Sequence, residues 1–165
     1  MDIKKLLKQY IKDNLKENIG VGRHAKMSSH IFYSDYCKAP EESIDNYIEN
    51  EKEENTFQTK LFNYIDSKGL KDSDVYNKVN VDRRLFSKIR SDINYHPSKE
   101  TIILLGLSLE LTEYEIEDLL ESASYSLPKN NEYDLIIRFC FKEKIYDLDK
   151  VNGFLFDYNL KTLNN

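Results

Sequence analysis

The sequence is poor in glycine, proline and cysteine, and each scarcity excludes a class of protein. Five Gly and three Pro among 165 residues argue against a turn-rich sandwich or barrel and favour a helical protein. Two cysteines, Cys37 and Cys140, cannot form a disulfide framework and indicate a reducing compartment. The longest apolar run, residues 102–107, is far shorter than the roughly 18 residues of a membrane helix. The lysine-interrupted N-terminus also lacks the apolar core of a signal peptide. We therefore expect a cytoplasmic protein without a membrane partner.

The net charge of −5 and the pI of about 5.3 give no overall basic field that would attract nucleic acid. This charge is an average over separated regions of the sequence. Acidic residues are concentrated in residues 41–54 and 110–121. Residues 78–92 contain five basic residues and two acids, a local charge of +3. The local positive charge of residues 78–92 is therefore compatible with a nucleic-acid partner, although the net charge of the chain argues against one.

The chain divides near residue 54. Apolar residues at positions 3, 6, 7, 10, 11 and 15 predict an amphipathic helix over residues 2–18, ended by Gly20 and Gly22. Residues 20–54 lose this periodicity and are expected to form an acidic linker with at most one short helix around Ile44, Tyr47 and Ile48. We thus expect an N-terminal part, residues 1–54, and a helical domain, residues 55–165.

From residue 55 onward the sequence predicts an all-α domain, because no run alternates with a period of two. The first helix presents Phe57, Leu61, Phe62 and Ile65 on one face and ends at Gly69. Further helices are expected to be capped by Asp72 or Ser73, by Asp82, by Ser98 and by Thr112, the last with Glu115 as a capping box. Two more helices are expected from Asn130 to about Lys144 and from Asp147 to about Tyr158.

Two stretches, KDSDVYNKVNVDRRLFSKIRS and HPSKETIILLGLSLELTEYEIEDLL, resemble the Cro/C1-type (XRE-like) helix-turn-helix family. Within it, the DRRLFSKIRS-type helix is most similar to small bacterial proteins of poorly defined role. The resemblance implies a five-helix domain whose second helix spans residues 72–79, with a turn at Asn80 and a recognition helix over residues 82–91 in the DNA major groove. The sequence departs from the family where Tyr76 replaces Ala and Asn80 replaces Gly, and where Arg90, Ser91 and Asp92 replace Glu-x-Gly.

The recognition helix should have a buried edge, Leu85, Phe86 and Ile89, and an outward polar face. Helical spacing places the first four of the residues listed next on this outward face. The two arginines that follow them in the list flank the face, and the lysine precedes the turn. The candidate DNA-binding residues are Arg84, Ser87, Lys88 and Ser91, then Arg83 and Arg90, and Lys78. Arg84 and Lys88 are the strongest candidates for reading bases, while Arg83 and Arg90 are better suited to phosphate.

The apolar segments outside the motif leave two questions open. The last two helices carry apolar residues on several sides, so a second face either belongs to a C2 homodimer interface or is enclosed within a larger domain. The helix over residues 2–18 either folds back on the domain or offers its apolar stripe to a protein partner.

Other reactive residues give no enzyme signature, and we expect no cofactor and no metal. His24, His30, Cys37 and His96 have no zinc-binding spacing, and Cys140 is expected in the core. The carboxylates of Glu113, Glu115, Glu117 and Asp118 are interpreted as a solvated face. The leading hypothesis is a DNA-binding transcriptional regulator. The alternative is a non-catalytic protein-interaction module, such as an adaptor, an antitoxin-like protein or an inhibitor in bacterial stress or phage conflict.

Overall fold

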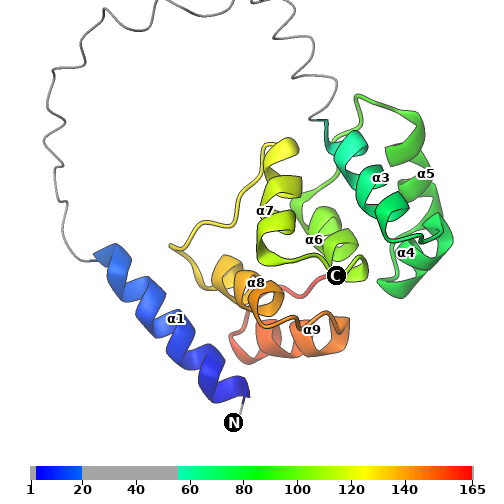
Figure 1. Cartoon of the computed structure of the whole chain (residues 1–165). Coiled ribbons are helices and arrows are strands. Elements are labelled where there is room, and N and C mark those ends of the chain that lie inside the picture. Colours follow the sequence, from blue (N-terminus) through cyan, green and yellow to red (C-terminus); the bar gives the residue numbers. More distant parts are fainter. Residues whose placement is uncertain (1–2, 20–55, 165) are drawn as a thin grey trace, which may run out of the picture.

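The computed structural model describes residues 3–19 and 56–164, and in these ranges it contains helices and no strand (Figure 1). The helices are α1 (Ile3–Ile19), α3 (Phe57–Ser67), α4 (Asp72–Lys78), α5 (Arg83–Ser91), α6 (Lys99–Ser108), α7 (Glu113–Ser122), α8 (Glu132–Lys142) and α9 (Leu148–Asp157). The all-α prediction is confirmed. The short helix expected around Ile44, and the glycines expected to end α1, lie outside the described residues.

Local capping determines where most of these helices begin. Asp82, Ser98 and Thr112 each accept a hydrogen bond from a backbone N–H in the first turn, as predicted. Asp147, the expected start of the last helix, is its N-cap and accepts from the Lys150 N–H at 2.9 Å. The capping box is complete, because Glu115 also accepts from the Thr112 N–H at 2.7 Å.

Two helix starts differ from the prediction. α4 has Lys71 at its N-cap without a side-chain cap, so Asp72 is its first helical residue and not its cap. The Asp72 carboxylate binds Arg90 instead. α8 begins at Glu132 and is capped by Asn131, whose side chain accepts from the Asp134 N–H at 2.8 Å. The expected start at Asn130 was therefore slightly early.

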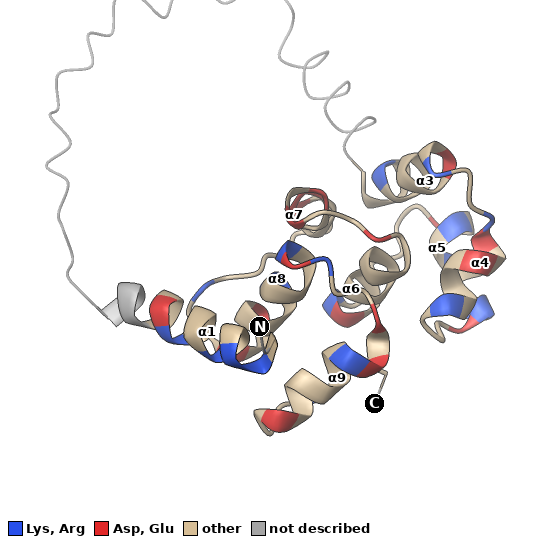
Figure 2. Cartoon of the chain, turned by 60° about the horizontal axis from the view of Figure 1, so that its bottom comes forward, with Lys and Arg blue, Asp and Glu red and all other residues tan. Residues whose placement is uncertain are grey.

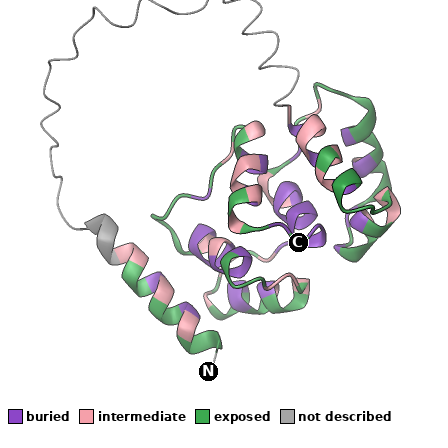
Figure 3. Ribbon diagram, in the orientation of Figure 1, coloured by how far each residue is buried: buried purple, intermediate pink, exposed green. Residues whose placement is uncertain are grey.

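The core is organised around α6, which is buried on all sides (Figure 3). Every residue from Thr101 to Leu109 is buried, and α4 and α7 pack directly against this helix. Gly106 lies at a close contact of α6 with α7 and α8, since a Cβ there would meet side-chain atoms of Ile116 and Phe141. A helix that is apolar all round requires such enclosure.

α1 packs against α8, so the helix predicted over residues 2–18 folds back on the domain. Leu7 and Ile11 are buried at 2% and 4% exposure, and the Tyr10 ring lies 5.4 Å from that of Phe139. The second apolar face of α8 is thereby covered within one chain, because Phe139 and its helical neighbours are buried without a second copy.

The helices α3, α4 and α5 form one end of the molecule, and α1 lies at the other (Figure 1). The segment after α9 runs back toward α4, with Leu163 buried and the Asn164 side chain donating to the Val79 carbonyl at 2.9 Å. α5 is therefore left on an outer edge, far from α1.

Candidate functional site

The connection between α4 and α5 is a tight left-handed turn. Asn80 has a φ of 53°, in the left-handed region that asparagine tolerates better than most residues. The Val81 N–H donates to the Tyr76 carbonyl at 2.9 Å and the Asn80 N–H to the Asn77 carbonyl at 3.3 Å, which is the paired pattern of a Schellman motif. Asp82 then starts α5 by accepting from the Arg84 N–H at 2.6 Å. The direction of α5 is thus set by local hydrogen bonds between Tyr76 and Arg84.

One edge of α5 is packed into the domain. Phe86 and Ile89 are buried at 2% and 0% exposure, while Leu85 is half-buried. The Phe86 ring lies 5.5 Å from the ring of Tyr76 and 6.3 Å, edge on, from that of Phe62. Tyr76 is half-buried, so it lies at the rim of this contact.

The opposite face of α5 is exposed and basic (Figure 2). All the candidate residues of this helix are exposed, namely Arg83, Arg84, Ser87, Lys88, Arg90 and Ser91. Within residues 3–19 and 56–164, no carboxylate lies within ion-pair distance of Arg83 or Arg84. These two guanidinium groups are therefore available to an anionic ligand.

The two other candidate cations of α5 make contacts within the chain. Arg90 donates to both carboxylate oxygens of Asp72, at 2.6 and 2.7 Å, and its guanidinium lies 4.0 Å from the ring centre of Phe62. The Lys88 ammonium lies 4.4 Å from the ring centre of Tyr95. Cation–π contact of this kind holds a charged side chain in place without neutralising it.

Lys78 is exposed, but it lies at the end of α4 and not on the basic face of α5. Its ammonium binds Glu110 at 2.6 Å and the Ser108 carbonyl at 3.2 Å. The hydrogen bond and charge of Lys78 lower the pKa of the Glu110 carboxyl. Of the candidate residues, the structure thus groups the six on α5 and places Lys78 at the contact between α4 and α6.

Three supporting contacts of this region were not anticipated from the sequence. Gln58 of α3 donates from Nε2 to the carbonyls of Asp92, Ile93 and Tyr95, at 3.0–3.4 Å, and so fixes the loop after α5. Ser108 donates to the Val75 carbonyl at 2.6 Å, and Asn164 supports the turn through Val79. Because the acceptors are backbone carbonyls, no residue pattern in the sequence could have identified them.

The other reactive groups have structural roles. Burial raises the pKa of the Cys140 thiol to about 12, which confirms the prediction of a core residue. His96 bonds the Ala123 carbonyl through Nε2 at 2.7 Å. His24, His30 and Cys37 lie outside the described residues. In the parts of the chain that are described, no three His, Cys, Asp or Glu side chains come together as metal ligands.

Glu113, Glu115, Glu117 and Asp118 of α7 are only partly exposed to solvent, and three of them form ion pairs that the sequence did not reveal. Arg138 of α8 binds Glu113 at 2.9 Å and also binds Glu117. Lys60 of α3 binds Asp118 at 2.6 Å. The sequence did not reveal these pairs because the balancing cations come from helices that are distant in sequence.

None of the helices formed by the described residues combines the length and the hydropathy needed to cross a lipid bilayer. No protein-family model, curated protein or solved structure matches the chain.

Proposed function

We propose that this protein binds double-stranded DNA as a helix-turn-helix transcriptional regulator and places α5 in the major groove. The observation that carries the proposal is the exposed face of α5, on which Arg83 and Arg84 have no carboxylate partner among the described residues. An α-helix fits the major groove, and arginine there can bond bidentately to guanine.

The orientation of α5 supports this use. A helix that recognises bases must be held rigidly by the rest of the domain, and its outer face must remain accessible to DNA. Phe86 and Ile89 anchor the inner edge, and the bidentate pair of Arg90 with Asp72 ties α5 to the start of α4. α1 lies against α8 at the other end of the molecule and leaves this face uncovered.

We assign separate roles to the residues of the face. Arg84 and Lys88 lie one helical turn apart and face base edges, while Ser87 and Ser91 offer hydroxyl groups along the same ridge. Arg83 contacts phosphate. Arg90, already bound to Asp72, positions the helix and adds positive charge near the backbone of the DNA.

The test is selection of duplexes from a random library at low salt, followed by titration of a selected duplex by fluorescence anisotropy. Replacing Arg84 by alanine is expected to cost about 1–3 kcal/mol of binding free energy, or roughly 5- to 150-fold in affinity. Replacing Arg83 should weaken all duplexes alike and reduce the salt dependence by about one phosphate contact.

The matched control removes positive charge elsewhere. Lys5→Ala/Lys150→Ala takes two exposed lysines from α1 and α9, and it should leave DNA affinity close to that of the wild type. Absence of retained DNA at low salt, or equal weakening by this control and by Arg84→Ala/Lys88→Ala, would overturn the proposal. The protein-interaction module would then be the better account of the fold.

A further inference from the structure

The Lys88 ammonium, on the exposed face of α5, lies 4.4 Å from the ring centre of Tyr95 in the loop that follows this helix. Lys88 is exposed and Tyr95 is half-buried. In the part of the chain that the structure describes, no carboxylate lies within 4 Å of this ammonium. The ring attracts the cation through its quadrupole and carries no charge of its own, so Lys88 is held with its full positive charge.

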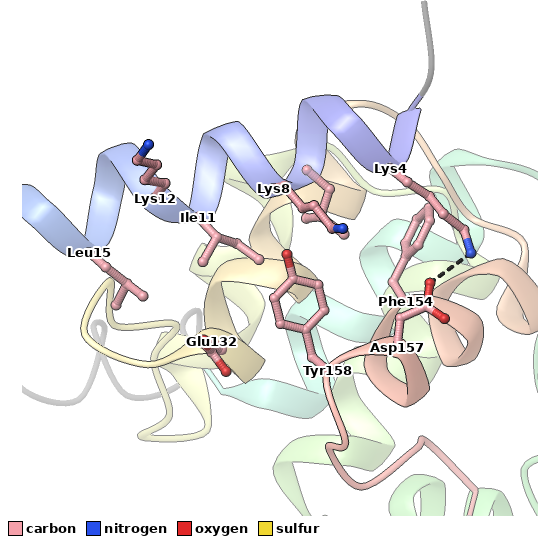
Figure 4. A pocket seen from close by; sticks show the side chains of 10 residues that line it. Lys4, Lys8, Ile11, Lys12, Leu15, Glu132, Phe154, Asp157 and Tyr158 are labelled. Atoms are coloured by element: carbon pink, nitrogen blue, oxygen red, sulfur yellow. Dashed lines mark hydrogen bonds and ion pairs between the residues drawn. The ribbon is translucent and has the colours of Figure 1, made fainter.

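The acid nearest to Lys88 in sequence is turned to another use. Asp92 follows Lys88 by four residues, the spacing at which opposite charges on a helix can pair. Exposed lysines do pair with acids elsewhere, as Lys4 of α1 does with Asp157 of α9 at 2.7 Å (Figure 4). Asp92 instead ends α5 in an extended conformation, and its Oδ1 accepts from the Asn94 N–H at 3.0 Å. The loop therefore engages this carboxylate, and the tyrosine ring contacts the ammonium in its place.

The loop that carries the Tyr95 ring is fixed by α3. The Gln58 amide donates to the carbonyl oxygens of Asp92 at 3.2 Å, Ile93 at 3.0 Å and Tyr95 at 3.4 Å. Gln58 is half-buried, and its neighbour Phe57 is buried in the core. The position of the ring is thus determined by the packed helix α3 and not by the loop alone.

We propose that Tyr95, held in place by Gln58, is a positioning residue that orients Lys88 for contact with DNA. This inference rests on the proposed function of α5. A lysine side chain has many rotamers, and the loss of this freedom opposes binding. Contact with the ring restricts the rotamers before DNA arrives, and such preorganisation reduces the cost of binding. A tyrosine that only filled the loop would instead support all residues of α5 alike.

The first test uses NMR spectroscopy of the full chain without DNA. The ring current of Tyr95 should shift the Hε protons of Lys88 upfield from their position in the urea-unfolded chain. Tyr95→Leu should abolish this shift, and Tyr95→Phe should retain it, because a phenyl face also attracts cations. Gln58→Met removes the amide donors at similar length and should reduce the shift. The matched control is Tyr114→Leu on α7, where the side chain is 79% exposed, and it should leave the shift unchanged.

The second test measures DNA binding by fluorescence anisotropy with the duplex selected for the wild type. Tyr95→Leu should weaken binding about two- to fivefold, the effect expected from an exposed cation–π contact, while Tyr95→Phe should bind like the wild type. In a Lys88→Ala background Tyr95→Leu should cause no further loss. Arg84→Ala should weaken the wild type and the Tyr95→Leu variant by the same factor, because the ring contacts Lys88 and leaves Arg84 unaffected.

The two tests distinguish failure of the positioning role from failure of DNA binding. A Lys88 shift that is absent, or that survives Tyr95→Leu, would refute the positioning role whether or not DNA binds. Independent effects of Tyr95 and Lys88 on DNA affinity, or an Arg84 effect that shrinks in Tyr95→Leu, would also refute it and leave DNA binding intact. A wild type that shows the shift but retains no duplex at low salt would refute the proposed function, and the positioning role with it.

Discussion

Replacement of Gly106 by alanine should destabilise the domain, whereas the same replacement at Gly153 should stabilise it. Both glycines lie inside helices, α6 and α9, where alanine is favoured by about 1 kcal/mol over glycine. The two sites differ in what a new methyl group would meet. At Gly153 no heavy atom lies within 4 Å of a Cβ, while at Gly106 the Cβ would lie 2.5 Å from Cδ1 of Ile116 and 3.2 Å from Cζ of Phe141.

The size of the destabilisation by Gly106→Ala depends on how far the side chains of Ile116 and Phe141 can move. Ile116 and Phe141 are buried at 0% and 1% exposure, so neither side chain can turn into solvent to make room. Overpacking of this kind costs about 1–3 kcal/mol. After the propensity gain, we expect Gly106→Ala to lower the free energy of unfolding by about 1 kcal/mol, and Gly153→Ala to raise it by up to about 1 kcal/mol.

Urea unfolding followed by far-ultraviolet circular dichroism measures both values, and their difference is the informative quantity. The helix propensity contributes equally to the two variants, so the difference of about 1–3 kcal/mol isolates the steric cost at the contact of α6, α7 and α8. In thermal unfolding, 1 kcal/mol corresponds to a shift of about 2–4 °C for a chain of this size. Equal stabilisation by both substitutions would refute the close approach of these helices.

Three further predictions concern the Cys140 thiol, the Tyr64 phenol and the ion pair of Asp72 with Arg90. In a Cys37→Ser background the Cys140 thiol, with its pKa raised to about 12, should react with a disulfide reagent only after unfolding, and rapid reaction of the native protein would contradict its burial. Burial, with Asp118 and Glu115 nearby, raises the pKa of Tyr64 to about 12, so between pH 10 and 12 the unfolded chain loses a phenol proton that the folded chain keeps. Stability measured by urea unfolding should therefore fall across this range, and a Tyr64→Phe variant should lose less. A double-mutant cycle of Asp72→Ala and Arg90→Ala should give a coupling of roughly 0.5–1 kcal/mol, as for an exposed but bidentate pair, and zero coupling would show that Arg90 is held by Phe62 alone.

Features that depend on neighbouring residues were predictable from the sequence. The capping box of Thr112 and Glu115, and the positive φ of Asn80, each follow from the chemistry of a few adjacent residues, and both are present. The exposed face of α5 follows from helical periodicity, which places Phe86 and Ile89 on one side and the arginines on the other. These parts of the fold and of the candidate site needed no knowledge of the tertiary arrangement.

Pairings between distant helices could not be predicted in the same way. The sequence predicted Asp72 as a helix cap because aspartate is a common N-cap residue. Nothing in the sequence shows that Arg90 lies within reach of its carboxylate. The acids of α7 looked solvated for the same reason, since Arg138 follows them on another helix. In a chain with 24 basic and 29 acidic residues, many pairings satisfy the charges equally well, and only the packing of apolar faces selects among them.

The complete burial of α6 also has a consequence for the chain before it folds. Residues 101–109 contain no charged residue and no proline, and they combine isoleucine and leucine in a segment long enough to form a cross-β stack. In the nascent or denatured chain only Lys99 and Glu100 on one side and Glu110 on the other oppose intermolecular strand pairing. We expect destabilised variants to aggregate through this segment and to depend on chaperones in the cell. The same segment that forms the centre of the folded core as α6 is therefore the one most prone to intermolecular strand pairing in the unfolded chain.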